Sequence, residues 1–271
     1  MRIFLAFLLA FTINGQLTGQ ELFVVTDPAS NVPTGALSVR LSNSLFKEVF
    51  EDGYNYHLMP ELTYGINKNL MLRASAFLSN RNKSLYTEGA NLFAKYRFYS
   101  TDDLHSHFRM AAFARYSFNR ADIHQEQLEI MGHNSGYEAG MVVTQLIKKV
   151  AISTSASFEK ATDNKPDYEF PKSQSDTATN YTLSVGKLMY PKKYTTFKET
   201  NINLMLEFVG QTLNDNGKTY IDVVPSVQFI FNSQARVDIG YRRELYSSMI
   251  RSAPNGVYLN FEYTFFNISK S

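Results

Sequence analysis

The sequence predicts a closed, antiparallel transmembrane β-barrel of about twelve strands, with ten or fourteen strands as alternatives. Polar and apolar residues alternate in about twelve segments, the pattern of strands that have one polar and one apolar face. After the N-terminus no segment approaches about 18 consecutive apolar residues, which excludes a transmembrane helix. The chain nevertheless contains 17 Tyr and 21 Phe at a slightly negative mean hydropathy, as expected of a barrel with an apolar outside and a polar inside.

The N-terminus has the pattern of a secretory signal peptide. Arg2 precedes an apolar run over residues 3–11, and a stretch of polar and small residues follows. We therefore expect a signal peptide at residues 1–20, cleaved in the region from Gly19 to Glu21, because this apolar run is too short to span a bilayer. A buried strand or helix at the start of a cytosolic domain is the alternative. The further divisions expected are a periplasmic N-terminal segment at 21–35, the barrel at 36–266 and a C-terminal tail at 267–271.

Composition excludes several classes of protein. The chain contains no Cys, which rules out a lipoprotein anchor, disulfides and thiolate metal sites. Removing residues 1–20 takes away one Arg and no acid, so the net charge falls from +2 to +1. That balance gives no basis for nucleic-acid binding. We expect no cofactor.

The first six predicted strands are residues 36–46, 56–66, 70–78, 89–99, 107–119 and 135–147. In the first of them, Leu37 and Val39 alternate with Arg40. Residues 67–69, read as Asn-Lys-Asn, predict a tight turn between the second and third strands. The fourth and fifth strands place aromatic residues on one face, and the only full charges on their other face are Lys and Arg.

The last six predicted strands are residues 150–160, 179–190, 200–211, 219–231, 235–246 and 256–266. The final pair shows the alternation most clearly. Val237 and Ile239 lie on the face opposite Asp238, and Phe261 lies on the face opposite Glu262. This period of two predicts that each strand has one apolar and one polar face.

The connections offer an independent test, because a bacterial barrel alternates longer outward loops with short periplasmic turns. The predicted outward loops are 47–55, 80–88, 120–134, 161–178, 212–218 and 247–255. The predicted turns are 67–69, 100–106, 148–149, 191–199 and 232–234. The longest connection, 161–178, falls in the outward set, where we expect a solvated loop rather than a constriction. The 191–199 connection is long for a turn and is the weakest point in the strand count.

A soluble β-sandwich or lipocalin-like shell would show the same alternation with its faces reversed. Two observations favour the membrane. The polar faces carry full charges in most strands, which a packed apolar core could not contain. Aromatic residues gather near the ends of the apolar faces, as in the interfacial girdles of membrane barrels. Closure is then required, because an open sheet edge in lipid leaves backbone groups unpaired.

Two segments resemble a known family. Residues 222–245 contain a Pro-x-x-Gln strand, a short Asn turn and a Val-Asp-Ile-Gly strand, and residues 64–70 read Tyr-Gly-Ile-Asn-Lys-Asn-Leu. Both are similar to hairpins of the outer-membrane transporter barrels of the meta-pathway phenol degradation family. The resemblance implies a Bacteroidetes-type outer-membrane barrel with a role in transport. The C-terminus departs from the usual pattern, since the final aromatic, Phe266, is followed by five more residues.

If the apolar faces meet lipid, the opposite faces line the interior. The expected basic lining residues are Arg40, Arg73, Lys95, Arg97, Arg109, Arg115 and Arg242. The expected acidic lining residues are Glu61, Glu138, Glu159, Glu207, Asp222, Asp238, Glu244 and Glu262. Most of the bases lie on the third to fifth strands and most of the acids on the sixth to twelfth. In a closed cylinder this distribution predicts a positive wall facing a negative wall.

The segregated charge suggests a passive channel for small polar or zwitterionic solutes, because a transverse field orients dipoles and rejects apolar molecules. In the alternative interpretation the charges pair across the lumen and fill it. The barrel would then be a non-conducting structural or partner-binding protein of the envelope, with loops such as 120–134 or 161–178 contacting another envelope protein. Lipid and lipopolysaccharide of the outer membrane are the other expected partners.

An enzyme is the least favoured alternative. A lipid hydrolase in such a barrel would need a histidine that polarises a serine. The five histidines, His57, His105, His107, His124 and His133, have no recognisable nucleophile motif beside them. His105 and His107 flank Ser106 and could bind a metal, but two potential ligands in a turn are more typical of a polar surface. We therefore expect no enzymatic activity.

Overall fold

A computed structural model describes residues 23–50, 52–81, 84–103, 106–164, 168–191 and 199–268. The signal peptide predicted at residues 1–20 lies outside the described residues, as do positions 192–198 of the connection that weakened the strand count. Among the described residues, no helix is long and apolar enough to cross a membrane.

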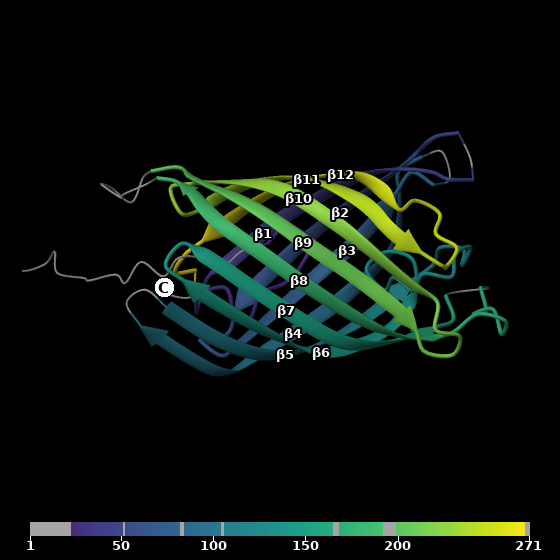
Figure 1. Ribbon diagram of the computed structural model, residues 1–271, viewed down its shortest axis with the longest axis horizontal. Coiled ribbons are helices and arrows are strands. Elements are labelled where there is room, and N and C mark those ends of the chain that lie inside the picture. The colour runs from purple at the N-terminus through teal and green to yellow at the C-terminus, as the bar shows by residue number, and fades with distance from the viewer. Residues whose placement is uncertain are drawn as a thin grey trace, which may run out of the picture.

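The described residues form a closed barrel of twelve antiparallel strands, which confirms the predicted fold class and strand number (Figure 1). Each strand pairs with its neighbours in the chain, and the barrel closes where β1 pairs with β12 from Leu37 with Phe265 to Lys47 with Asn255. The strands are β1 (Leu37–Lys47), β2 (Tyr54–Gly65), β3 (Leu70–Ser79), β4 (Tyr86–Asp103), β5 (Ser106–Asn119), β6 (Ser135–Ile147), β7 (Val150–Thr162), β8 (Thr177–Tyr190), β9 (Asn201–Leu213), β10 (Thr219–Phe231), β11 (Ala235–Ser247) and β12 (Asn255–Phe265).

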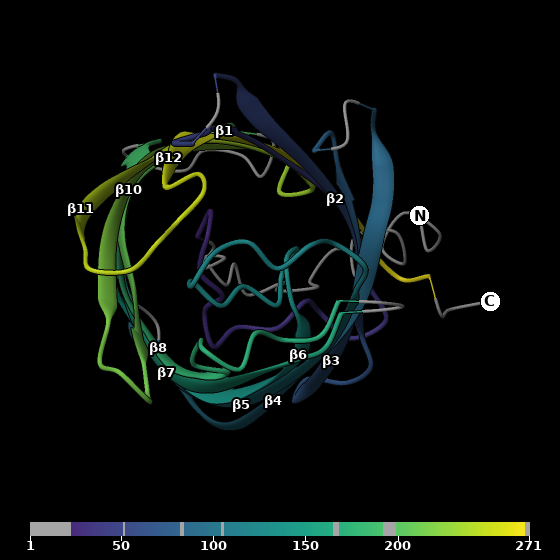
Figure 2. The same cartoon turned by 90° about the vertical axis from the view of Figure 1, so that its right-hand side faces the viewer.

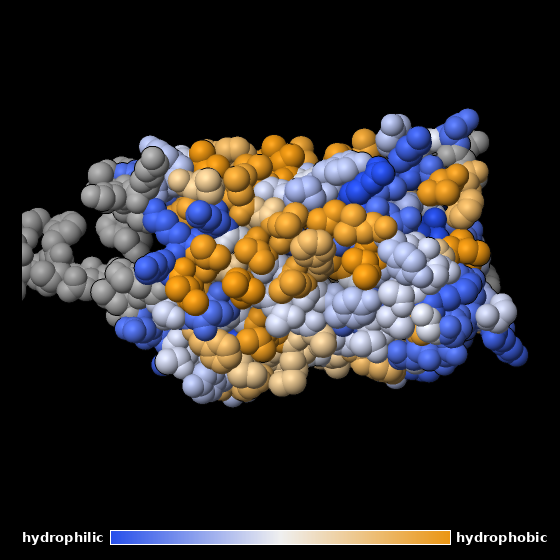
Figure 3. Space-filling model, viewed as in Figure 1, coloured by the Kyte–Doolittle hydropathy of each residue, from blue (hydrophilic) through white to orange (hydrophobic). Residues whose placement is uncertain are grey.

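The two faces of the sheet differ as the alternation predicts. Outward side chains such as Leu92 and Tyr116 are 67% and 62% exposed, whereas inward Glu61 and Asp222 are 2% and 0% exposed. Apolar residues gather along the middle of the visible outer face and polar residues toward its two ends (Figure 3). A soluble shell would bury its apolar face, so this outer surface is that of a barrel surrounded by lipid.

The two ends of the barrel differ in their connections. The turn end carries the connections at 66–69, 148–149 and 232–234, and Ile268 near the C-terminus donates its backbone N–H to Gly35 at the same end. Asn232 and Ser233 have φ values of 51° and 56°, the left-handed conformation of the two central residues of a type I′ turn, which the N–H of Gln234 closes by donating to the Phe231 carbonyl. The opposite, loop end carries the connections between β5 and β6 and between β7 and β8.

The expected turn at 100–106 is mostly strand in the structure. β4 and β5 continue to pair as far as Asp103 with Ser106, beyond a register shift between Arg97 and Tyr99. Asp102 supports the extension, because its carboxylate accepts hydrogen bonds from Arg109 at 2.8 Å. The hairpin therefore extends past β3, which begins opposite Tyr96, whereas β6 pairs with β5 as far as Ile147 with Ser106.

Two segments lie inside the ring of strands in the view along the barrel axis (Figure 2). Residues 23–33, which we call the N-terminal segment, lie inside the barrel at the turn end, where Asn31 donates to the carbonyl of Asn69. The sequence assigns these residues to a periplasmic N-terminal segment at 21–35, separate from the barrel at 36–266, and in the structure they lie within the barrel. Residues 120–134, which we call the inner loop, enter from the loop end. The physical reason for both is width, since twelve strands enclose a space that inward side chains alone do not fill.

The 161–178 connection supports the inner loop. Asn164 is 1% exposed, and its amide donates to the carbonyls of Ala121 and His133, at 2.7 Å in each case. Phe170 packs against the same region. The inner loop, not 161–178, therefore enters the lumen, and the expectation that 161–178 is simply solvated fails for these residues.

Candidate functional site

Basic side chains on three adjacent strands hold the N-terminal segment. They come from β3, β4 and β5 and meet acceptors at successive positions of the segment, so each cation has an oxygen partner. Charge-assisted hydrogen bonds of this kind are stronger than those between neutral groups. The contacts are Arg73 Nη2 with Asp27 Oδ1 at 2.7 Å, Lys95 Nζ with the Pro28 carbonyl at 2.7 Å, and Arg109 Nη1 with Ser30 Oγ at 2.9 Å. Burial raises the pKa of Asp27, but the charges of Arg73 and Lys95 hold that pKa well below its ordinary value.

Glu207 on β9 holds the same segment from the opposite wall. Its carboxylate accepts the backbone N–H groups of Val24 at 2.9 Å and Thr26 at 2.8 Å, and both of its oxygens also receive the N–H of Val25. Thr26 Oγ1 makes a further hydrogen bond of 2.7 Å with Ser184 Oγ on β8. Glu207 is fully buried, so three consecutive backbone donors replace the water that a buried carboxylate would otherwise lack.

A second buried acid, Glu159 on β7, holds the inner loop. Its carboxylate accepts the backbone N–H of Ile130 at 3.0 Å and the amide of Asn180 at 2.6 Å. Gln211 on β9 pairs with the backbone of Leu128 in both directions, at 2.9 Å for each hydrogen bond. The two inward segments are therefore secured in the same way, by side chains of the wall that satisfy backbone groups.

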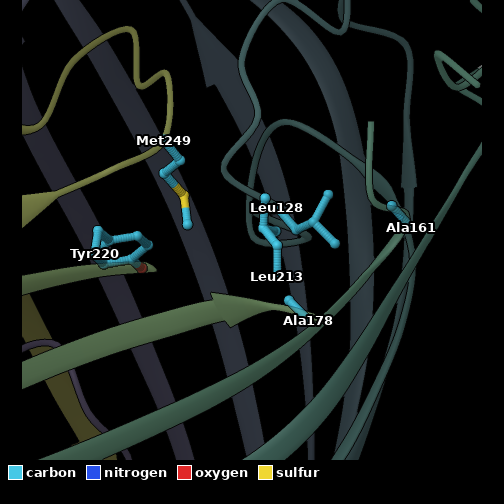
Figure 4. Close-up of a cluster of buried hydrophobic side chains, with 6 residues drawn as sticks. All are labelled: Leu128, Ala161, Ala178, Leu213, Tyr220 and Met249. Carbon is cyan, nitrogen blue, oxygen red and sulfur yellow. The ribbon is translucent and has the colours of Figure 1, made fainter. Parts of the chain in front are cut away.

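Apolar packing adds to the attachment of the inner loop. Leu128, 2% exposed, lies among side chains from the loop ends of the neighbouring strands (Figure 4). Tyr220 and Met249 approach from β10 and from the connection that follows β11. The cluster comprises Leu128, Ala161, Ala178, Leu213, Tyr220 and Met249.

A polar chamber of about 300 Å³ lies between the two inward segments. Its floor is residues 24–27 of the N-terminal segment, and its roof includes Gln125 and Leu128 to Met131 of the inner loop. A volume of this size is at the lower end of the range for small-molecule sites. The lumen is thus not a solid core.

Ion pairs surround the turn-end side of the chamber. Arg40 on β1 lies 3.7 Å from Glu61 and 3.9 Å from Asp238. Arg236 on β11 lies 3.2 Å from Asp238 and 2.6 Å from Glu262. These pairs link β1, β2, β11 and β12 across the closure of the barrel, and they leave few charges on this wall without a counter-charge.

Further ion pairs lie beside the chamber and at its loop-end side. Arg115 donates to Glu138 at 2.6 Å and also lies over the ring of Phe93. Asp222 on β10 accepts from Arg242 at 2.6 Å and from Arg251 at 2.6 and 2.8 Å. The four strand residues Arg115, Glu138, Asp222 and Arg242 are all at least nine-tenths buried, so their pairing is needed to keep them charged inside the barrel.

Three histidines meet where the inner loop contacts the wall. The ring of His133 lies 5.2 Å from that of His57 on β2 and 6.0 Å from that of His124, measured between centroids. Arg81 hydrogen-bonds to His133, and Glu129 lies 3.3 Å from its Nε2. Among the described residues, no group of three or more His, Asp or Glu side chains is arranged to hold a metal ion. Burial and then the charge of Arg81 lower the pKa of His133 well below its ordinary value of 6.5.

We expect acid to loosen the inner loop. The pKa of His133 is lowered only while the loop is packed. Neutral His133 therefore contributes its full stabilisation of the packed loop above pH 6.5, and this stabilisation is lost as the pH falls below that value. Protection of residues 126–134 from hydrogen exchange, normalised to the unfolded-chain rate at each pH, should therefore fall between pH 7.5 and pH 5.5. The variant His133→Gln should lose most of this pH dependence. An unchanged pH dependence in that variant would assign the effect to another group.

The structure places the expected lining residues as follows. Those buried inside the barrel are Glu61, Lys95, Arg109, Arg115, Glu138, Glu159, Glu207, Asp222, Asp238 and Arg242. Arg40, Arg73 and Glu262 also point inward and are partly buried, with side chains 12 to 16% exposed. Two lie at the ends of the barrel instead. Arg97 donates to the Lys68 carbonyl at the turn end, where β4 shifts register, and Glu244 meets Arg251 at the loop end.

Among the described residues, several charged groups of the interior were missed from the sequence, and four of them are Glu88, Arg236, Asp27 and Arg251. Glu88 and Arg236 lie on strands, and the polar face of 235–246 already pointed to Arg236. Asp27 and Arg251 lie in connections, where no alternation signals an inward direction. With Arg236, Arg242 and Arg251 among the acids of β10 to β12, that part of the interior is a mixed network rather than the negative wall expected. On β3 to β5, Arg73, Lys95 and Arg109 hold the N-terminal segment.

Comparison with known proteins supports the fold. No protein-family model matches the chain, and no curated protein sequence matches it significantly. An outer-membrane channel from Pseudomonas putida F1 is similar in structure with a TM-score of 0.56 and 14% identity, covering 89% of this chain and 100% of that one. The KdgM porin has a TM-score of 0.50 and 9% identity, with 84% and 99% covered. The NanC porin has a TM-score of 0.50 and 10% identity, with 84% and 98% covered. These similarities show the architecture of outer-membrane channel barrels; the resemblance to the phenol degradation family stays a prediction.

Proposed function

We propose that this protein is a passive channel of the bacterial outer membrane for small polar or zwitterionic solutes, closed at rest by its N-terminal segment and inner loop. The observation that carries the proposal is the polar chamber between the two segments. A barrel built only as a scaffold has no need of such a chamber. Water can replace the hydrogen bonds and ion pairs that hold the two segments, so the release of a segment costs mainly the apolar packing around Leu128, Phe23 and Val24.

The setting of the channel follows from its surfaces. The apolar outer face would lie in lipid, with the turn end in the periplasm and the loop end outside the cell, where lipopolysaccharide would surround it. A signal peptide at residues 1–20 would deliver the chain across the inner membrane. The N-terminal segment would then close the periplasmic end and the inner loop the outer end.

A specific observation also favours the alternative of a non-conducting structural or partner-binding barrel. Ion pairs and two inward segments occupy much of the lumen, as that interpretation requires. In that case the loop end would contact another envelope protein. Controlled movement of the N-terminal segment distinguishes the two functions.

A reversible disulfide provides the test. Thr26 Oγ1 and Ser184 Oγ lie 2.7 Å apart, and the chain has no native Cys, so Thr26→Cys with Ser184→Cys places one thiol pair between the segment and the wall. Single-channel currents in planar bilayers should be absent or brief in the oxidised protein. Reduction should restore them to the level of the two single-Cys variants, which serve as controls.

Two results would contradict the proposal. Currents that are the same in the oxidised and reduced states would show that ions do not pass the N-terminal segment. Silence in the wild-type protein, in the reduced variant and in both controls would favour the non-conducting barrel.

A further inference from the structure

The chamber wall contains buried amide groups without hydrogen-bond partners. Asn55 on β2 is 3% exposed, and neither its Oδ1 nor its Nδ2 is hydrogen-bonded. Asn260 on β12 has a free Oδ1 at 2% exposure, and Gln125 of the inner loop has a free Nε2 at 6% exposure. All three side chains line the chamber. Buried polar atoms are nearly always paired, so these groups indicate positions that a ligand completes.

Two of these three residues, Asn55 and Asn260, lie on one wall, formed by β12, β1 and β2, and Gln125 reaches the chamber from the inner loop. The register places Phe46 beside Asn55, Ser44 between His57 and Tyr258, and Ser42 beside Asn260. Successive inward residues of a strand are about 6.6 Å apart, so these rows form a ladder along the barrel axis. The ladder presents amide and hydroxyl groups at several positions along the barrel axis.

This ladder is uncharged, whereas the charged groups around it already face a counter-charge; the Nε groups of Arg40 and Arg115 are their donors without a hydrogen-bond partner. Arg40 is paired with Glu61, and Arg242 is paired with Asp222. A charged solute would have to break one of these buried pairs to gain a partner, which is costly. An uncharged solute would only need to fill the free amide positions.

Aromatic rings complete the wall. Phe46 and Tyr258 meet edge to face with centroids 5.3 Å apart, and both line the chamber. A sugar ring has hydroxyl groups around its edge and an apolar C–H face. The amides and hydroxyls of the wall can hydrogen-bond to the hydroxyl groups of a sugar. The adjacent aromatic surface can pack against its C–H face.

We propose that the chamber binds an uncharged polyhydroxylated solute of about the size of a hexose, on the wall formed by Asn55, Asn260 and the Ser42–Ser44 ladder. This inference rests on the proposed channel function and narrows its solute class from polar or zwitterionic to neutral and hydroxylated.

Equilibrium dialysis tests the site without depending on conduction or on the rate of entry. Radiolabelled glucose, glucuronate and serine, as neutral, anionic and zwitterionic probes, are equilibrated with the detergent-solubilised protein. Glucose should be retained more than the other two. Asn55→Leu with Asn260→Leu should weaken glucose retention about tenfold, the effect of losing two or more net hydrogen bonds. Asn216→Leu, on an exposed turn between β9 and β10, is the matched control and should bind as the wild type does.

The outcomes separate this inference from the channel itself. Equal retention of glucose by the wild type and the double variant, or stronger retention of glucuronate or serine, would overturn the neutral site while leaving the disulfide-gated current untouched. Glucose binding that depends on Asn55 and Asn260 in a protein without any current would support the site and reject conduction. If the double variant does not fold, as judged by loss of its heat-dependent gel mobility shift, Asn55→Leu alone is compared with Asn216→Leu.

Discussion

Replacing Glu207 with Gln should open the turn end of the barrel. The amide keeps the size of the side chain but turns one acceptor into a donor, which then faces the backbone N–H groups of residues 24–26. Losing the charge-assisted hydrogen bonds should cost the closed state about 3 kcal/mol. That change shifts the ratio of closed to open states by roughly a hundredfold. Planar-bilayer recordings should show a matching rise in the time that the channel spends open.

Glu169→Gln is the control for this substitution, because Glu169 lies exposed in the connection between β7 and β8. It should leave the currents unchanged. The N-terminal segment should also become accessible in Glu207→Gln, so a single Cys at Val25 should react faster with a water-soluble maleimide than it does in the wild-type background. A closed, unreactive Glu207→Gln protein would show that the basic residues of β3 to β5 hold the segment without Glu207.

Most of the strands could be predicted from the sequence because their polar and apolar residues alternate between the lumen and the lipid-facing surface. In β12, Val257, Leu259 and Phe261 face outward, and Asn260 between them faces the lumen. The polarity of each of these side chains therefore indicates whether the residue faces lipid or the lumen. The β4–β5 hairpin was predicted too short because its last residues are polar on both faces, which is the composition of a turn.

The inward segments could not be predicted in the same way. Their direction depends on partners far away in the sequence, as when Val24 meets Glu207, 183 positions later. The segment itself has no alternation, and its donors are backbone groups that any sequence provides. The basic wall was visible in the sequence, but its purpose was not, because Arg73, Lys95 and Arg109 gain their role only from acceptors on residues 27–30.

Asp222→Leu should produce the largest loss of stability among the substitutions considered. Asp222 is fully buried and accepts from two arginines, Arg242 of β11 and Arg251 of the connection that follows. Removing the acid leaves two buried cations without this counter-charge. Breaking a buried ion pair in this way lowers the free energy of unfolding by about 3 to 5 kcal/mol. Urea unfolding in detergent micelles, followed by the loss of the fast-migrating folded band on gels, measures the effect. Asp52→Leu, at an exposed position between β1 and β2, should change the midpoint little.

Removing the two arginines as well distinguishes the cost of unpaired buried cations from the loss of the contacts that Asp222 makes. Asp222→Leu combined with Arg242→Met and Arg251→Met replaces the whole cluster with apolar side chains, and such replacements are often nearly neutral. The triple variant should therefore unfold at a higher urea concentration than Asp222→Leu alone. Arg251 also donates to Gln127 at 2.7 Å, so the triple variant should still hold the inner loop less firmly than the wild type. A triple variant less stable than the single one would mean that the arginines stabilise the barrel through partners other than Asp222, such as the ring of Tyr220, which lies 3.9 Å from the Arg251 guanidinium.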